Sequence, residues 1–189
     1  MGKPYHHGDL RAALIEAGLA LIGREGLEAL SLRRLAAEVG VSHTAPKNHF
    51  ATVRGLLTAI AAEGFRRLAT ALRRAVDGAE GREMRLRAGA QAYVGFALDH
   101  PQLFQLMFSP LHSDPADPDL RKAGSDSYAV LADVAPAFGA PSDAPYAAEL
   151  ALWSLLHGYA TLLLGDKLRT DEAGAPLLDV VELLPIRPA

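Results

Sequence analysis

The feature of this sequence that most constrains its fold is a glycine, Gly40, that separates two short and very different segments. Before it, apolar residues recur at i, i+3, i+4 and i+7, which is the spacing of one face of a helix: Leu32, Leu35, Ala36 and Val39. Ser31 stands where a helix N-cap belongs, and glycine is the residue that most often ends a helix. The spacing therefore predicts a helix over 31–38 that stops in a tight turn.

The segment after the turn, SHTAPKNHF over 42–50, is polar and holds two histidines, a lysine, an asparagine and a proline. Ser42 is a candidate N-cap, and Val41, Ala45 and Phe50 are the residues that can anchor the segment in a core. Pro46 lies near the first turn, where a missing N–H costs least, but it biases the residue before it away from helical geometry. We therefore expect a short, irregular third helix that shows polar side chains outward.

Longer helical patterns flank this pair. The residues Leu10, Leu14, Ala17 and Leu21 predict a helix over 9–24, with Asp9 as its N-cap and Gly26 as its stop. A second stripe, from Leu57 to Leu72, predicts a long helix over 52–75. Three short helices with a tight glycine turn between the second and third form the helix-turn-helix pattern. In that geometry the third helix lies in the DNA major groove and the second braces it across the backbone.

Charge is distributed unevenly along the 189 residues. The net charge of −3 argues by itself against a nucleic-acid binder. Residues 1–74, however, hold 11 Lys/Arg and 6 Asp/Glu, a balance of +5, whereas residues 75–189 hold 8 and 16, a balance of −8. The basic first part is thus the candidate for meeting a polyanion, and chance clustering on solvated faces is the alternative.

Other classes of function are disfavoured by what the sequence lacks. The chain has no cysteine, which excludes disulfides and thiolate metal sites. His43 and His49 are six residues apart, on different faces of a helix, and no paired metal-ligand spacing or phosphate-binding glycine motif is present. No apolar run approaches the roughly 18 residues of a membrane span, and the N-terminus lacks the apolar core of a signal peptide. We expect a cytoplasmic protein with no enzymatic activity, no metal, no cofactor and no membrane contact.

The rest of the chain also predicts helices. One runs over 82–108 with a break at His100–Pro101, and others run over 117–135, 145–166 and 175–185. The segment 145–166 is apolar on nearly all sides, so it must be buried on more than one face. One face can meet its own domain and the other a second subunit, and burial within one subunit is the alternative. The prediction is an all-α chain of about nine helices, divided into domains over 1–53 and 54–189.

The stretch GLEALSLRRLAAEVGVSHTAPKNHFATVRGLL resembles the DNA-binding domain of the TetR (tetracycline-repressor) family of bacterial regulators. The matching positions are Ser31, Arg33, Ala36, Gly40, Val41, Ser42, His49, Phe50, Leu56 and Leu57. The stretch 152–162 is similar to a C-terminal domain type of the family that is marked by a Trp, a His and a Gly, here Trp153, His157 and Gly158. Two positions depart from the pattern, since Lys47 replaces a Tyr that reaches a phosphate and Val53, beside Arg54, replaces a Lys.

The resemblance implies a set of DNA-contacting residues. His43, Thr44 and Asn48 are candidates for contact with base edges, and the alternative is that they meet phosphate or water. The candidates for phosphate contact are Ser31, Ser42, Lys47 and His49, with Arg33 on the DNA side of the second helix and Arg54 in place of the missing lysine. His49 can instead pack beside Phe50.

The resemblance also implies a small-molecule pocket in the second domain and a homodimer held by a four-helix interface. The aromatic, sulfur and imidazole candidates for the pocket, which could equally be core, are Tyr93, Phe96, Phe104, Met107, Phe108, Tyr128, Trp153 and His157. An apolar or aromatic effector with one polar handle would suit them. We therefore expect a ligand-responsive repressor that its effector releases from a palindromic operator, although the sequence does not separate a repressor from an activator. The alternative is a small-molecule-binding helical protein with a degenerate DNA-binding head.

Overall fold

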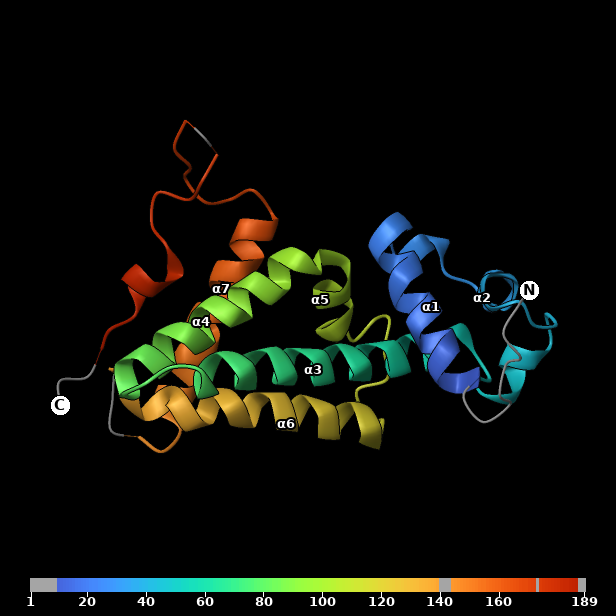
Figure 1. The fold of residues 1–189 in the computed structure, drawn as a ribbon, viewed down its shortest axis with the longest axis horizontal. Coiled ribbons are helices and arrows are strands. Elements are labelled where there is room, and N and C mark those ends of the chain that lie inside the picture. The colour runs from blue at the N-terminus through green and yellow to red at the C-terminus, as the bar shows by residue number, and fades with distance from the viewer. Residues whose placement is uncertain (1–9, 140–143, 173, 187–189) are drawn as a thin grey trace. The chain divides into compact units, whose positions relative to one another are not determined.

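The computed structural model describes residues 10–139, 144–172 and 174–186 (Figure 1). Within these ranges the regular structure consists of seven α-helices, short turns of 3-10 helix and two isolated β-bridges. The predicted all-α class is confirmed, although about nine helices were expected. The proposed N-cap Asp9 lies outside the described residues.

The first helices begin and end where the local sequence predicts. α1 spans Leu10–Glu25, a short 3-10 turn spans Leu27–Ala29, and α2 spans Leu32–Val39. The Ser31 hydroxyl caps α2 by accepting a hydrogen bond from the Arg34 N–H. Gly40 ends α2 at φ 74°, in the left-handed region that favours glycine. The predicted cap and stop of the second helix are therefore confirmed.

The third helix is a single 3-10 turn, η2, over Ala45–Asn48. Pro46 has no N–H to donate and is buried, and its carbonyl accepts from the N–H groups of both His49 and Phe50, at 3.0 and 2.9 Å. The expectation of a short and irregular helix is confirmed, but Ser42 is not its N-cap. The carbonyl of Ser42 instead closes a turn onto the Ala45 N–H, so η2 begins two residues later than the sequence suggests.

Four longer helices follow. They are α3 (Val53–Asp77), α4 (Arg82–Asp99), α6 (Pro118–Val134) and α7 (Ala147–Leu164). A short α5 (Pro101–Met107) begins at the predicted break, where proline occupies the first helical position. A 3-10 turn, η3 (Ala135–Ala137), extends α6.

The predicted helix over 175–185 is wrong. Asp179 and Glu182 form a capping box that starts a helix at Val180, and Pro185 follows too soon for it to lengthen, so only the 3-10 turn η4 (Val180–Leu183) forms. Before η4 the chain makes a hairpin-like turn, in which Thr170 bridges Pro176 and the Leu177 N–H donates to the Arg169 carbonyl at 2.9 Å. We call residues 168–172 and 174–178 the C-terminal hairpin.

The chain forms two compact units. The first unit contains the residues up to Gly64 together with Gln102–Ala123, and the second contains Phe65–Pro101 together with the residues from Gly124 onward. Thus α5 and the loop after it belong with the helix-turn-helix, although they lie far from it in sequence. The boundary after residue 53 stays a prediction, because a division by contacts assigns no function.

The core of the first unit closes around Gly64. A β-carbon at this position would lie 2.7 Å from Met107 Sδ and 2.9 Å from Leu103 Cδ1, so any larger residue would require these two side chains of α5 to move. In the same unit Phe50 is 4% exposed, and the Arg11 guanidinium lies over its ring.

We predict that Gly64→Leu lowers the free energy of unfolding by about 1–3 kcal/mol, because the added side chain must displace both neighbours. Urea unfolding followed by circular dichroism measures the change. Gly23→Leu is the matched control, since Gly23 is also helical but a β-carbon there meets nothing within 4 Å. Equal stability of the two variants would contradict the close packing of α3 on α5.

Candidate nucleic-acid interface and effector-domain sites

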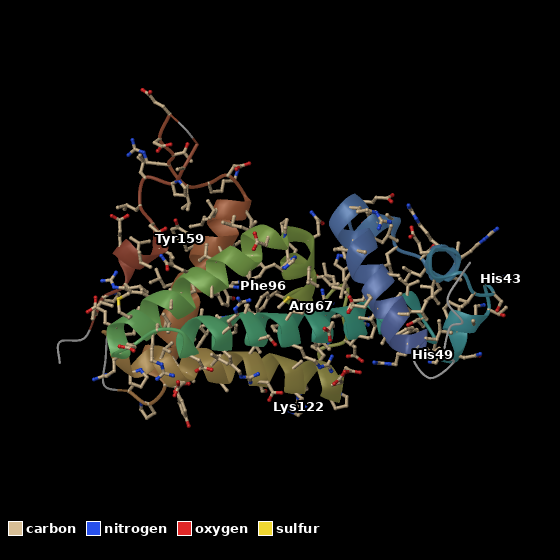
Figure 2. All side chains as sticks on the ribbon, viewed as in Figure 1. His43, His49, Arg67, Phe96, Lys122 and Tyr159 are labelled. Atoms are coloured by element: carbon tan, nitrogen blue, oxygen red, sulfur yellow. The ribbon has the colours of Figure 1, made fainter. Side chains whose placement is uncertain are left out.

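The segment from Ser42 to His49 presents a polar surface. Its side chains are exposed except for Ala45, which is half-buried, and Pro46, which is buried. The Ser42 and Thr44 hydroxyls lie 3.2 Å apart, which ties the start of the segment together. Figure 2 labels His43 and His49, which lie at its two ends. We call residues 42–49 the reading segment.

The two arginines of α2 differ in their partners. Arg34 forms an ion pair with Glu25, and Arg24 of α1 forms one with Glu38 at 3.0 Å, so the two helices are cross-linked by charge. Arg33 is exposed and forms no ion pair within the described part of the chain. This guanidinium is therefore available to an anionic partner, whereas that of Arg34 is occupied.

Arg54 has a partner that its sequence position does not suggest. Its guanidinium donates from Nε and Nη2 to the carbonyl of Ser113, at 3.2 and 2.9 Å. One turn later, the buried Thr58 hydroxyl donates to the Arg54 carbonyl and accepts from the Asp114 N–H, at 2.8 and 2.9 Å. We call these four residues, Arg54, Thr58, Ser113 and Asp114, the latch. It fastens the start of α3 to the loop that follows α5, within the first unit.

In the second unit the structure brings together four of the candidate pocket residues. The Tyr93 hydroxyl lies 3.0 Å from His157 Nδ1 and is also hydrogen-bonded by Trp153. The rings of Trp153 and Tyr128 meet edge to face at 5.8 Å between centroids, and the Tyr128 hydroxyl donates to Glu149. The result is a chain of polar contacts inside an aromatic cluster.

Burial determines the protonation states of Tyr93 and His157 in this chain of polar contacts. Desolvation raises the pKa of Tyr93 far above its usual range, against the opposing effect of the Trp153 hydrogen bond, so its hydroxyl keeps its proton. Desolvation also lowers the pKa of His157, which keeps the imidazole neutral. Tyr93 can therefore donate to His157 Nδ1 while the indole N–H of Trp153 donates to Tyr93.

The remaining candidate pocket residues do not join this cluster. Phe96 is buried in the second unit and its ring contacts that of His100 at 4.9 Å. Phe104 and Met107 are buried in the first unit, and Phe108 packs on Phe104 at 5.0 Å. The eight candidates are thus divided between the two units.

One face of α7 is left uncovered. Its buried residues are Leu152, Leu156, Tyr159 and Ala160, whereas Leu150 and Leu162 are 59% and 47% exposed. The predicted burial of one face is confirmed, and the alternative of complete burial within one subunit is wrong for this helix. By length and composition alone α7 could also span a membrane, so the expectation that no stretch approaches that length is wrong.

A groove of about 690 Å³ runs along this face of α7. One wall consists of α7 residues, namely Ser154, Leu155, Gly158, Tyr159 and Leu162. The other wall belongs to the C-terminal hairpin and η4, and its lining includes Leu168, Arg169, Leu177, Leu178 and Leu183. Sequence reasoning missed this groove because the second wall was expected to be a helix. The recurrence of Leu150, Ser154, Gly158 and Leu162 at four-residue intervals could have indicated the first wall.

Comparison with known proteins identifies both the N-terminal and the C-terminal domain. Residues 14–60 match the family of bacterial regulatory proteins of the tetR type, and residues 86–181 match the tetracyclin repressor-like C-terminal domain. The resemblance of 152–162 to a Trp-His-Gly-marked type is not tested by these matches and stays a prediction.

Individual relatives agree with these matches. A regulator from Mycobacterium tuberculosis, described as the uncharacterized HTH-type transcriptional regulator Rv0681, is 26% identical over 172 residues, covering 90% of this chain and 78% of the relative. A solved structure of a protein of unknown function from Rhodococcus sp. RHA1 is 38% identical, with a TM-score of 0.77 over 96% of this chain and 94% of that chain. The multidrug binding protein EbrR, solved with imidazole, is 25% identical, with a TM-score of 0.60 over 94% and 89%.

The matched domains, the capped α2 with its glycine turn, and the exposed reading segment agree with one another. The chain belongs to the TetR family of bacterial transcriptional regulators.

Proposed function

We propose that this protein is a repressor that binds a palindromic operator as a homodimer in the cytoplasm and is released by a small molecule. The observation that carries the proposal is the reading segment, an exposed polar surface held by a buried proline and a buried phenylalanine next to a capped helix. A single 3-10 turn contacts few base pairs. Two copies on a twofold axis, spaced by about one turn of DNA (about 34–36 Å), would read a palindrome.

The DNA contacts follow from the exposure of these side chains. His43, Thr44 and Asn48 are proposed to reach base edges. Phosphates are proposed to be met by Ser31, Arg33, Ser42, Lys47 and His49. Because Lys47 replaces the tyrosine of the family pattern, it supplies a flexible point charge rather than a hydroxyl in a fixed position.

For Arg54 we propose a different role from the phosphate contact that its sequence position suggests. Its guanidinium already makes two hydrogen bonds to Ser113, so Arg54 positions the start of α3 against the loop after α5. The latch would then transmit a displacement of that loop to the reading segment without touching DNA.

The polar chain of Tyr93, Trp153 and His157 is the proposed handle of the effector site. Tyr128, whose ring meets that of Trp153, is proposed to make an apolar contact beside this handle, and Phe96 of the same unit is a further candidate. Such a site suits an apolar or aromatic molecule that bears one hydrogen-bonding group. An effector of this class releases DNA only to the extent that it binds better to the conformation in which the two reading segments are wrongly spaced.

A second function remains specific enough to test, namely a small-molecule-binding protein whose DNA-binding head has degenerated. The short η2, together with Lys47 and Val53 at positions where the family pattern has Tyr and Lys, favours it. Under this alternative the second unit would bind its ligand, but the reading segment would show no preference among DNA sequences.

Selection of bound duplexes from a random pool decides between the two functions. We expect an enriched palindrome for the unmodified protein. Lys47→Gln should weaken binding about equally for all sequences and reduce the slope of log affinity against log salt by about 1, because one phosphate contact is lost. Arg121→Gln, which removes an exposed cation of α6, is the control. A pool that shows no enrichment rejects the repressor proposal.

The role of Arg54 can be separated from that of Arg33 by the same salt titration. Arg33→Gln should reduce the slope by about 1, whereas Arg54→Gln should leave the slope unchanged and lower the free energy of unfolding by about 1 kcal/mol, because the latch is lost. Thr58→Val breaks the latch without a change of charge and should behave like Arg54→Gln. If Arg54→Gln reduces the slope as Arg33→Gln does, with unchanged stability, Arg54 contacts phosphate.

The neutral state of His157 predicts a pH dependence of stability. An unfolded histidine binds its proton near pH 6.5, but burial lowers the pKa of His157 in the folded protein. The unfolded state therefore binds more protons below that pH, so stability falls as the pH is lowered through about 6.5. The urea midpoint should fall less between pH 7.5 and 5.5 in His157→Gln than in the unmodified protein. The control is His43→Gln, at an exposed site. Its urea midpoint should fall as much as that of the unmodified protein.

A further inference from the structure

We propose that Tyr128, Glu149 and Trp153 bind an organic cation, a quaternary ammonium or a protonated amine, through the faces of the two rings and the charge of the carboxylate. We call these three residues the cation site. All three belong to the second unit, Tyr128 in α6 and the other two in α7. The inference rests on the effector site proposed above and adds the charge of the ligand's polar group.

The two rings form the walls of the cation site. The ring planes of Tyr128 and Trp153 stand at 78° to each other, with 5.8 Å between centroids, so a group placed in the angle between them faces both rings. Both side chains are half-buried, which leaves them partly open to solvent. The faces of indole and phenol rings carry negative charge density, so they attract a cation without a hydrogen bond.

Glu149 supplies a full negative charge beside the rings. Its carboxylate accepts a hydrogen bond from the Tyr128 hydroxyl at 3.0 Å, and it forms no ion pair within the described part of the chain. It is also the only Asp, Glu, Lys or Arg of α7. A half-buried carboxylate of this kind is the electrostatic complement of a positive ligand. Residues 75–189, with 8 Lys/Arg and 16 Asp/Glu, draw cations toward the same part of the chain.

The hydrogen bond between Tyr128 and Glu149 couples the charge to the ring. Burial and this hydrogen bond both raise the pKa of Tyr128, so its hydroxyl keeps the proton and remains the donor. A phenol that donates to a carboxylate is polarised toward a more electron-rich ring. The face of Tyr128 therefore attracts a cation more strongly than that of an unpaired tyrosine.

The start of α7 brings a third ring to this surface. Tyr146 precedes Glu149 by three residues and Trp153 by seven, so the three lie along one side of the helix. Its side chain is 74% exposed, and it lies close enough to Tyr128 to raise the pKa of that residue further. Its backbone is left-handed at φ 63°, a strained conformation of the kind that recurs at ligand-binding sites. Tyr146 is thus placed to cover a cation that the other two rings hold.

The fluorescence of Trp153 tests the proposal directly, because it is the single tryptophan of the chain. Choline and 3,3-dimethylbutan-1-ol are the probes, since they differ only in that carbon replaces the charged nitrogen. At constant ionic strength, choline should change the emission with a dissociation constant about tenfold lower than that of the neutral alcohol. Equal dissociation constants, or no response to choline, would overturn the proposal.

Glu149→Gln keeps an acceptor for Tyr128 but removes the charge. It should raise the dissociation constant of choline about fivefold and leave that of the neutral alcohol unchanged. Glu80→Gln, at an exposed carboxylate of the same unit, is the matched control and should bind choline as the unmodified protein does. If both variants weaken choline equally, the cation responds only to the overall charge of the protein and the cation site is rejected.

Substitutions of Tyr128 separate the ring from the hydroxyl. Tyr128→Phe keeps the ring and should retain most of the affinity for choline, whereas Tyr128→Leu should weaken it about tenfold. Circular dichroism checks that both variants keep the helical content of the unmodified protein. Equal affinities of the two variants for choline would show that the ring is not a wall of the site.

Failure of the proposed function gives a different pattern, because these titrations contain no DNA. A protein that prefers choline to the neutral alcohol but enriches no operator from the random pool is not a repressor, although its cation site stands. A protein that selects an operator but binds the two probes equally keeps the proposed function and loses only the cation site.

Discussion

The two hydrogen bonds from Arg54 to the Ser113 carbonyl are the interaction on which the first unit depends. They join residues 59 positions apart in sequence, and Thr58 adds a second connection to the same loop through Asp114. Because the charged guanidinium satisfies a carbonyl and Thr58 satisfies an N–H, the loop after α5 can lie against α3 without unpaired polar groups. The helix-turn-helix, the start of α3 and α5 therefore belong to a single compact unit.

The two units differ in the contacts that hold their helices together. In the first, the absence of a side chain at Gly64 lets Met107 and Leu103 of α5 pack closely on α3. In the second, the hydroxyl of a tyrosine that is 1% exposed depends on partners within the protein, among them the half-buried His157. If an effector binds here as proposed, its polar group would replace one of these internal partners, which would make the site more selective than a purely apolar cavity.

The features that could be predicted from the sequence are those that depend on residues close in the chain. Ser31 and Gly40 bound α2 through contacts within four residues, and Pro46 restricts η2 through its own ring, so these features were readable in advance. The partner of Arg54 could not be predicted, because it lies on a distant loop. The C-terminal hairpin could not be predicted either, because its apolar spacing fits a helix as well as a strand. The sequence marked Tyr93, Trp153 and His157 as pocket candidates by residue type, but it did not predict that they contact one another. Their hydrogen bonds depend on the packing of α4 against α7.

The exposure of the reading segment has a consequence for how this protein can change over generations. Its side chains from Ser42 to His49, apart from Ala45 and Pro46, contribute little packing, and substitutions at such surface positions usually alter stability by less than about 0.5 kcal/mol. Mutations there can therefore accumulate without unfolding the head, whose shape is kept by Pro46 and Phe50. If this segment reads an operator as proposed, duplicated copies of this gene would be free to acquire new operators by drift in a handful of codons, while the rest of the fold remains under constraint.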